Sequence, residues 1–160
     1  MGCGAPDLTA APYAGMAQMT LVKLYADEEG RELVHQLDAV AIAQIARVEV
    51  PAAMRRKQRT GELSSEDARV VTAEFEADYF GSDEELPRFV AVRTTAEVLD
   101  HAAHVCAVHG LRTYDGVQLS SALVARRAGP TCVQFAAFDH SLRAAAAAEG
   151  FALVPGDTSE

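Results

Sequence analysis

Short apolar runs of strand length alternate with longer helix-like segments along this chain, and this alternation restricts the fold more than any other feature. The apolar runs lie at residues 39–45, 88–94, 131–138 and 151–155. Helical periodicity, often closed by a glycine, marks residues 19–30, 31–37, 46–61, 64–80, 94–110, 114–127 and 141–150. Apolar strands that alternate with helices are typical of a parallel sheet covered on both faces. The sequence therefore predicts an α/β protein with three layers, α/β/α, around a central parallel sheet.

Two aspartates bracket one helix–strand unit of this pattern, Asp115 near its start and Asp139 at its end. A helix over residues 114–127 covers roughly 20 Å at ~1.5 Å per residue. The strand over residues 131–138 returns roughly 23 Å at ~3.3 Å per residue. Because the two lengths nearly cancel, we expect both aspartates at the same edge of the sheet.

A third acid, Glu49, follows the apolar run 39–45 within about one helical turn. It is therefore predicted at the carboxyl-terminal edge as well, where open α/β sheets bind their ligands. Carboxylates that converge repel one another, and a hard divalent cation such as Mg²⁺ or Mn²⁺ relieves that repulsion. The alternative is that the aspartates only cap helices and that the glutamate is solvated.

Net charge narrows the range of nucleic-acid partners. The 160 residues carry a formal net charge of −9, which argues against a protein that coats nucleic acid through a basic face. It does not exclude a nucleic-acid enzyme that gathers carboxylates around a metal. Basic residues cluster only at residues 54–59 and at Arg126 and Arg127, either as solvated helix faces or as phosphate contacts.

The chain length and patterning predict one domain over residues 13–155, preceded by a disordered segment 1–12 and followed by a polar tail 156–160. The apolar stretches are far shorter than the ~20 residues that cross a bilayer, and the start of the chain lacks the pattern of a signal peptide. Cys106 and Cys132 lie among apolar neighbours without metal-binding spacing, which favours reduced, buried thiols in a cytoplasmic protein.

Four segments carry a family resemblance: LVKLYADEEG, ARVEVPAAMRR, LRTYDGVQLSSALVARR and VQFAAFDHSLRAAAAAEGF. Over about residues 17–154 their order and spacing resemble the PIN-domain family, and most of all the VapC-like ribonuclease toxins of bacterial toxin–antitoxin pairs. The resemblance implies RNA cleavage at a Mg²⁺ or Mn²⁺ site, with Glu49, Asp115 and Asp139 as metal ligands and catalytic residues. It also implies a homodimer and a cognate antitoxin that covers the active groove.

The chain departs from that family at the first acidic position. The family motif ends its first strand in Asp-Thr/Ser-Ser-Ala, whereas this chain has Ala17, Gln18 and Met19 before LVKLY. Three hypotheses follow. The chain is a metal-dependent ribonuclease, either fully active or impaired by the missing acid; or an inactive PIN fold that binds RNA or an antitoxin; or an α/β scaffold whose acids are caps and solvated side chains.

Overall fold

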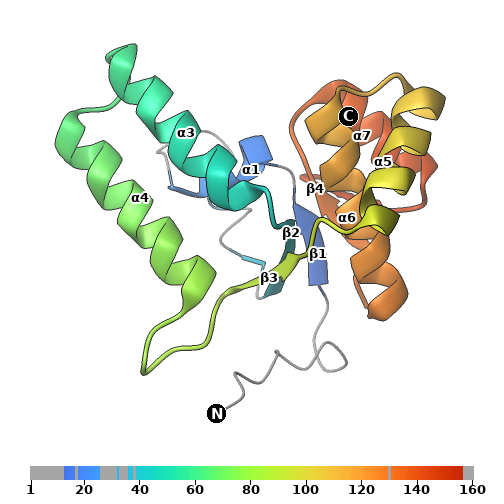
Figure 1. Ribbon diagram of the computed structural model, residues 1–160, viewed down its shortest axis with the longest axis horizontal. Coiled ribbons are helices and arrows are strands. Elements are labelled where there is room, and N and C mark those ends of the chain that lie inside the picture. The colour runs from blue at the N-terminus through green and yellow to red at the C-terminus, as the bar shows by residue number, and fades with distance from the viewer. Residues whose placement is uncertain are drawn as a thin grey trace.

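A central, entirely parallel sheet organises the computed structural model, which describes residues 13–16, 18–25, 32, 36–37, 39–129 and 131–156. The sheet has five strands in the order β3-β2-β1-β4-β5. Their bounds are β1 Tyr13–Met16, β2 Ala39–Ala43, β3 Phe89–Val92, β4 Gln134–Ala136 and β5 Ala152–Val154. The helices are α1 Gln18–Tyr25, α3 Ala46–Arg59, α4 Ser65–Phe80, α5 Ala96–His109, α6 Thr113–Ala128 and α7 His140–Ala148. The predicted α/β/α fold with a parallel sheet is confirmed (Figure 1).

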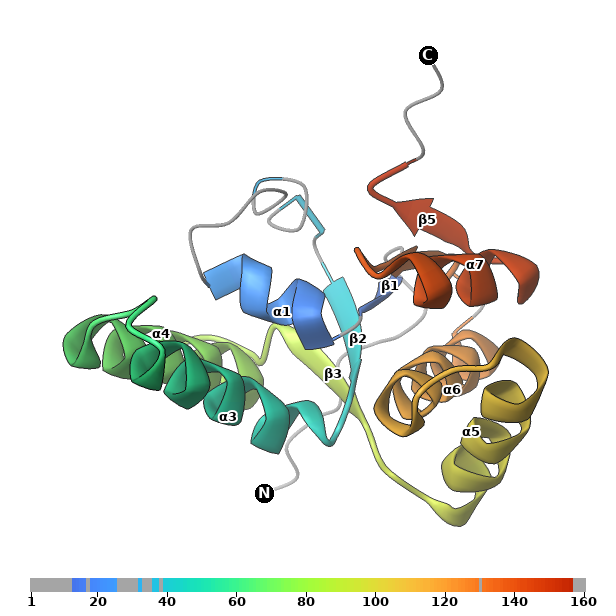
Figure 2. The ribbon, with the colours of Figure 1, turned by 90° about the horizontal axis from the view of Figure 1, so that it is seen from above.

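The helices form two layers, one on each face of the sheet. Helices α1, α3 and α4 lie on one side, and α5, α6 and α7 lie on the other (Figure 2). Successive side chains of β2 serve both layers, because side chains alternate across a strand. Val40 and Ile42 pack into the core on the α1, α3 and α4 side, whereas Ala43 packs with Val98 of α5 and Val117 of α6.

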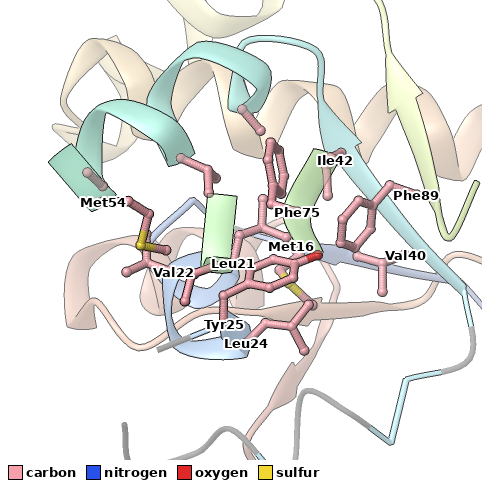
Figure 3. Packing of buried hydrophobic residues seen from close by; sticks show 14 of the residues in the cluster. Met16, Leu21, Val22, Leu24, Tyr25, Val40, Ile42, Met54, Phe75 and Phe89 are labelled. Atoms are coloured by element: carbon pink, nitrogen blue, oxygen red, sulfur yellow. The ribbon is translucent and has the colours of Figure 1, made fainter. Parts of the chain in front are cut away.

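The larger core joins the sheet to the first helical layer. Phe75 of α4 lies between Tyr25 of α1 and Phe89 of β3, with ring centroids 5.7 and 6.1 Å away respectively (Figure 3). The hydroxyl of Tyr25 donates a hydrogen bond of 2.6 Å to Asp78 Oδ2. Burial raises the pKa of Tyr25, and the hydrogen bond to Asp78 raises it further. The ring therefore packs in the core while its polar end is bonded, as buried tyrosines usually require.

Helix α6 approaches the sheet closely because β1 carries a glycine at the crossing. A Cβ atom built on Gly15 would lie 2.5 Å from Ala122 Cβ and 3.0 Å from the Phe135 ring. The absence of a side chain in the central strand thus sets how deeply α6 can pack.

Side-chain caps begin helices α4 and α5, and a glycine ends α5. Ser64 caps α4 by accepting a hydrogen bond of 3.0 Å from the backbone N–H of Asp67. Thr95 caps α5 in the same way, and Gly110 ends that helix in the left-handed conformation with φ of +67°.

The differences from the predicted elements concern the strands most. Strand β4 spans Gln134–Ala136 only, shorter than the predicted 131–138. Strand β1, in a segment poor in β-branched residues, is nevertheless central in the sheet because it pairs with β2 and β4. Segment 1–12 and residues 31 and 33–35 of the predicted helix 31–37 lie outside the described residues.

Candidate active site

Asp115 lies in the first turn of α6, and its side chain is half-buried. Burial raises the pKa of its carboxyl group, and the negative charge of Asp139 raises it further. The guanidinium of Arg112 acts in the opposite direction and lowers it. These interactions show that Asp115 and Asp139 come within electrostatic reach of each other, across the helix–strand unit that separates them in sequence.

Asp139 has a structural task of its own, because it is the N-cap of α7. Its side chain accepts a hydrogen bond of 2.9 Å from the backbone N–H of Leu142 through Oδ1. The residue is exposed and follows Phe138 just beyond the carboxyl end of β4. The ring of Phe138 lies under Lys23 of α1, whose Nζ is 4.7 Å from the ring centroid. A cation therefore lies close to the same edge of the sheet.

Glu49 occupies the first turn of α3, which begins just after β2 ends. Its side chain is half-buried, and it accepts a hydrogen bond of 3.3 Å from Gln118 Nε2 through Oε2. Burial raises the pKa of Glu49, the hydrogen bond from Gln118 lowers it, and the charge of Asp115 raises it. Glu49 is thus neither fully solvated nor isolated, and its carboxylate lies within electrostatic reach of Asp115.

Gln118 belongs to this group of side chains, and the sequence analysis missed it. It is 5% exposed, although amide side chains are mostly found at the surface. Two features of the sequence would have marked it: a polar side chain between Val117 and Leu119, and a spacing of i, i+3 from Asp115 on one helix.

The chemistry of this donor set suits a hard divalent cation. It consists of carboxylate oxygens, and both Glu49 and Asp115 have pKa values raised by burial and like charge, so a cation would stabilise their ionised forms. Within the part of the chain that the structure describes, no three Asp, Glu, His or Cys side chains form a ready-made metal cage. Mg²⁺ commonly uses one or two carboxylates and keeps several waters, so the arrangement matches an open site better than a closed one.

Comparison with known proteins identifies the family to which this chain belongs. No protein-family model matches the chain. The chain is 30% identical over 138 residues to Ribonuclease VapC45 from Mycobacterium tuberculosis (strain CDC 1551 / Oshkosh), covering 84% of this chain and 89% of that protein. The same figures hold for Ribonuclease VapC49 from Mycobacterium tuberculosis (strain ATCC 25618 / H37Rv). The chain belongs to the VapC ribonuclease family.

Ala17, where the sequence resemblance predicts the first acidic position, lies outside the described residues, between the end of β1 at Met16 and the start of α1 at Gln18. Asp7 and Asp27, the acids nearest to it in sequence, also lie outside them. The predicted metal ligands that lie within the described residues are therefore Glu49, Asp115 and Asp139.

Arg126 and Arg127, the basic pair near the end of α6, both contact residues outside that helix. Arg126 stacks over Phe151 at 4.2 Å and donates to the Glu149 carbonyl at 2.9 Å. Arg127 donates to Glu97 at 3.2 Å and lies 2.8 Å from His101 Nε2. The prediction of a solvated face is wrong for Arg126, which is partly buried because its guanidinium ties the end of α6 to the end of α7.

The described cysteines are free thiols, but they differ in burial. Cys132 is buried as predicted, whereas Cys106 is half-buried because it packs at the surface between α5 and α6. Among the described residues, no helix has both the length and the apolar character needed to span a membrane.

Proposed function

We propose that this VapC chain is a metal-dependent endoribonuclease that hydrolyses RNA phosphodiesters at a Mg²⁺ or Mn²⁺ ion held by Asp115, Glu49 and Asp139. The observation that carries the proposal is that the charge of Asp115 raises the pKa of Glu49 and the charge of Asp139 raises the pKa of Asp115, which links the acids of α3, α6 and the α7 cap in two pairs. The names of the two relatives as ribonucleases support the substrate class.

A bound divalent ion would lower the pKa of a water molecule and neutralise charge on the phosphate that is cleaved. The protein supplies the geometry. Asp115 is the proposed principal ligand, because its charge raises the pKa of Glu49 and the charge of Asp139 raises its own pKa. Glu49 accepts a hydrogen bond from the amide of Gln118. Asp139 uses Oδ1 for the helix cap, which leaves its second carboxylate oxygen for the ion.

A second candidate function is a catalytically inactive VapC fold that binds RNA or an antitoxin. The replacement of the first acid by Ala17 favours it, because the affinity for a hard ion falls when carboxylates are removed from the site. Under the proposed ribonuclease function, water takes the place of that ligand and the affinity for metal is reduced rather than abolished.

A cleavage assay separates the two candidates. The purified chain is incubated with a panel of short RNAs in Mn²⁺, beside Asp115→Asn and an EDTA control. The proposed activity requires metal-dependent cleavage by the wild type that falls at least about 100-fold in the variant, the size of loss expected when a principal metal ligand is removed. Equal inactivity of both proteins, with intact folds by circular dichroism, would reject the ribonuclease function and leave the binding protein.

The family membership also leads us to propose a cognate antitoxin partner, a homodimer and a cytoplasmic location. The free thiols of Cys106 and Cys132 suit a reducing compartment. Size-exclusion chromatography with light scattering tests the dimer, and co-purification with the product of an adjacent gene tests the antitoxin.

A further inference from the structure

We propose that Gln118 is a positioning residue that holds the Glu49 carboxylate in place for metal binding. This inference rests on the proposed function and adds to it a residue with no charge and no expected contact with the ion.

The hydrogen bond from Gln118 Nε2 to Glu49 Oε2 joins two helices on opposite faces of the sheet, α6 and α3. The two residues are 69 positions apart in sequence, so no local backbone geometry imposes the contact. Gln118 is 5% exposed, and burying an amide is unfavourable unless it is hydrogen-bonded. The amide is therefore retained in the interior at a place where it bonds a carboxylate.

Gln118 and Asp115 are on the same face of α6, because residues three apart on a helix are neighbours. One rigid helix thus carries a proposed metal ligand and the amide that orients a second ligand from another layer. Side chains that hydrogen-bond metal ligands from outside fix ligand orientation and commonly change metal affinity by about 10–100-fold when removed.

The competing reading is that this hydrogen bond only ties α6 to α3 and matters for folding alone. The two readings differ in one respect. If Gln118 acts through Glu49, its removal should weaken metal binding only while Glu49 is present as a ligand. If it acts on the fold in general, its removal should affect metal binding to the same extent with or without Glu49.

A double-mutant cycle on Mn²⁺ affinity makes this distinction. Calorimetric titrations with Mn²⁺ are compared for the wild type, Gln118→Met, Glu49→Ala and the double variant; alanine removes both the carboxylate and the acceptor of the Gln118 hydrogen bond. Methionine preserves the length of the side chain but removes the donor. We expect Gln118→Met to weaken Mn²⁺ binding by about 10–100-fold, and to cause no further loss in the Glu49→Ala background. An unchanged affinity in Gln118→Met, or an equal loss in both backgrounds, would overturn the inference.

Two further variants keep the experiment decisive. Ser120→Ala is the matched control, since Ser120 is buried on the same helix and its hydroxyl has no hydrogen-bond partner in the described structure, so it should bind Mn²⁺ as the wild type does. If Gln118→Met does not fold, Gln118→Asn shortens the side chain by one methylene and takes its place in the cycle. Absence of Mn²⁺ binding by the wild type would reject the proposed metal site itself. Wild-type binding that is insensitive to Gln118 would reject only the positioning role.

Discussion

Asp139 has two separate effects in this structure. It caps α7 through Oδ1, as the simplest interpretation of an aspartate before a helix predicts, and it also raises the pKa of Asp115 through its charge. The cap therefore does not exclude a role at the metal site, and substitutions can separate the two roles.

Asparagine caps helices about as well as aspartate but carries no charge. We expect Asp139→Asn to fold with the stability of the wild type, or slightly above it because repulsion with Asp115 is relieved, and to bind Mn²⁺ more weakly. Asp139→Ala should lose about 1 kcal/mol of stability as well, since the cap is gone. Urea unfolding and Mn²⁺ titration of both variants check this. Wild-type Mn²⁺ affinity in Asp139→Asn would show that Asp139 is a cap alone.

The raised pKa values of Glu49 and Asp115 predict a pH dependence of stability in the absence of metal. Each group has a folded pKa above its ordinary value, 4.5 for Glu49 and 3.8 for Asp115. The folded state therefore binds protons more tightly than the unfolded state, and stability falls as pH rises from the ordinary value through the raised folded value.

Glu49→Gln removes one of these groups, and its amide oxygen can still accept from Gln118. We expect the stability of the variant relative to the wild type to increase as pH rises from about 4 to about 7, measured by urea unfolding in EDTA. Added Mn²⁺ should reverse the trend for the wild type, because metal competes with protons for the carboxylates. A difference in stability that is independent of pH would contradict the raised pKa of Glu49.

At the scale of elements, the packing of α6 against the sheet sets where Asp115 and Gln118 lie. Gly15 of β1 sets how closely α6 can pack. A Cβ atom at Gly15 would overlap Ala122 Cβ, which has no rotamer with which to move away. We expect Gly15→Ala to destabilise the fold by about 1–3 kcal/mol through overpacking, measured by urea unfolding. Gly156→Ala is the control, because a Cβ atom there meets nothing within 4 Å. Equal stability of the two variants would show that α6 is not held close by Gly15.

The sequence predicted the helices well because their end signals are local. Gly110, which closes the predicted helix 94–110, acts within one turn. The strands were harder to predict. The segment that forms β1 has few β-branched residues, and the place of β1 in the centre of the sheet depends on pairing with β2 and β4, which no local pattern reveals. Gln118 was missed for the same reason, since its partner Glu49 lies on another helix.

At the scale of the whole molecule, the parallel topology brings the site together. The cancelling lengths of a helix and a strand were enough to predict that Asp115 and Asp139 share an edge, and the electrostatic interaction between their carboxyl groups agrees with that expectation. Which oxygens point at a common centre could not be predicted, because side-chain orientation depends on contacts such as the α7 cap and the Gln118 amide. The roles of the three acids in metal binding and catalysis stay predictions.

The most direct test of the central claim is a crystal of this protein soaked in MnCl₂, with anomalous difference density measured at the manganese edge. The account predicts a peak beside the Asp115 carboxylate, in contact with Glu49 or Asp139 as well, that disappears in Asp115→Asn. An ordered edge of the sheet with no manganese peak there, or a peak that persists without the Asp115 charge, would contradict it.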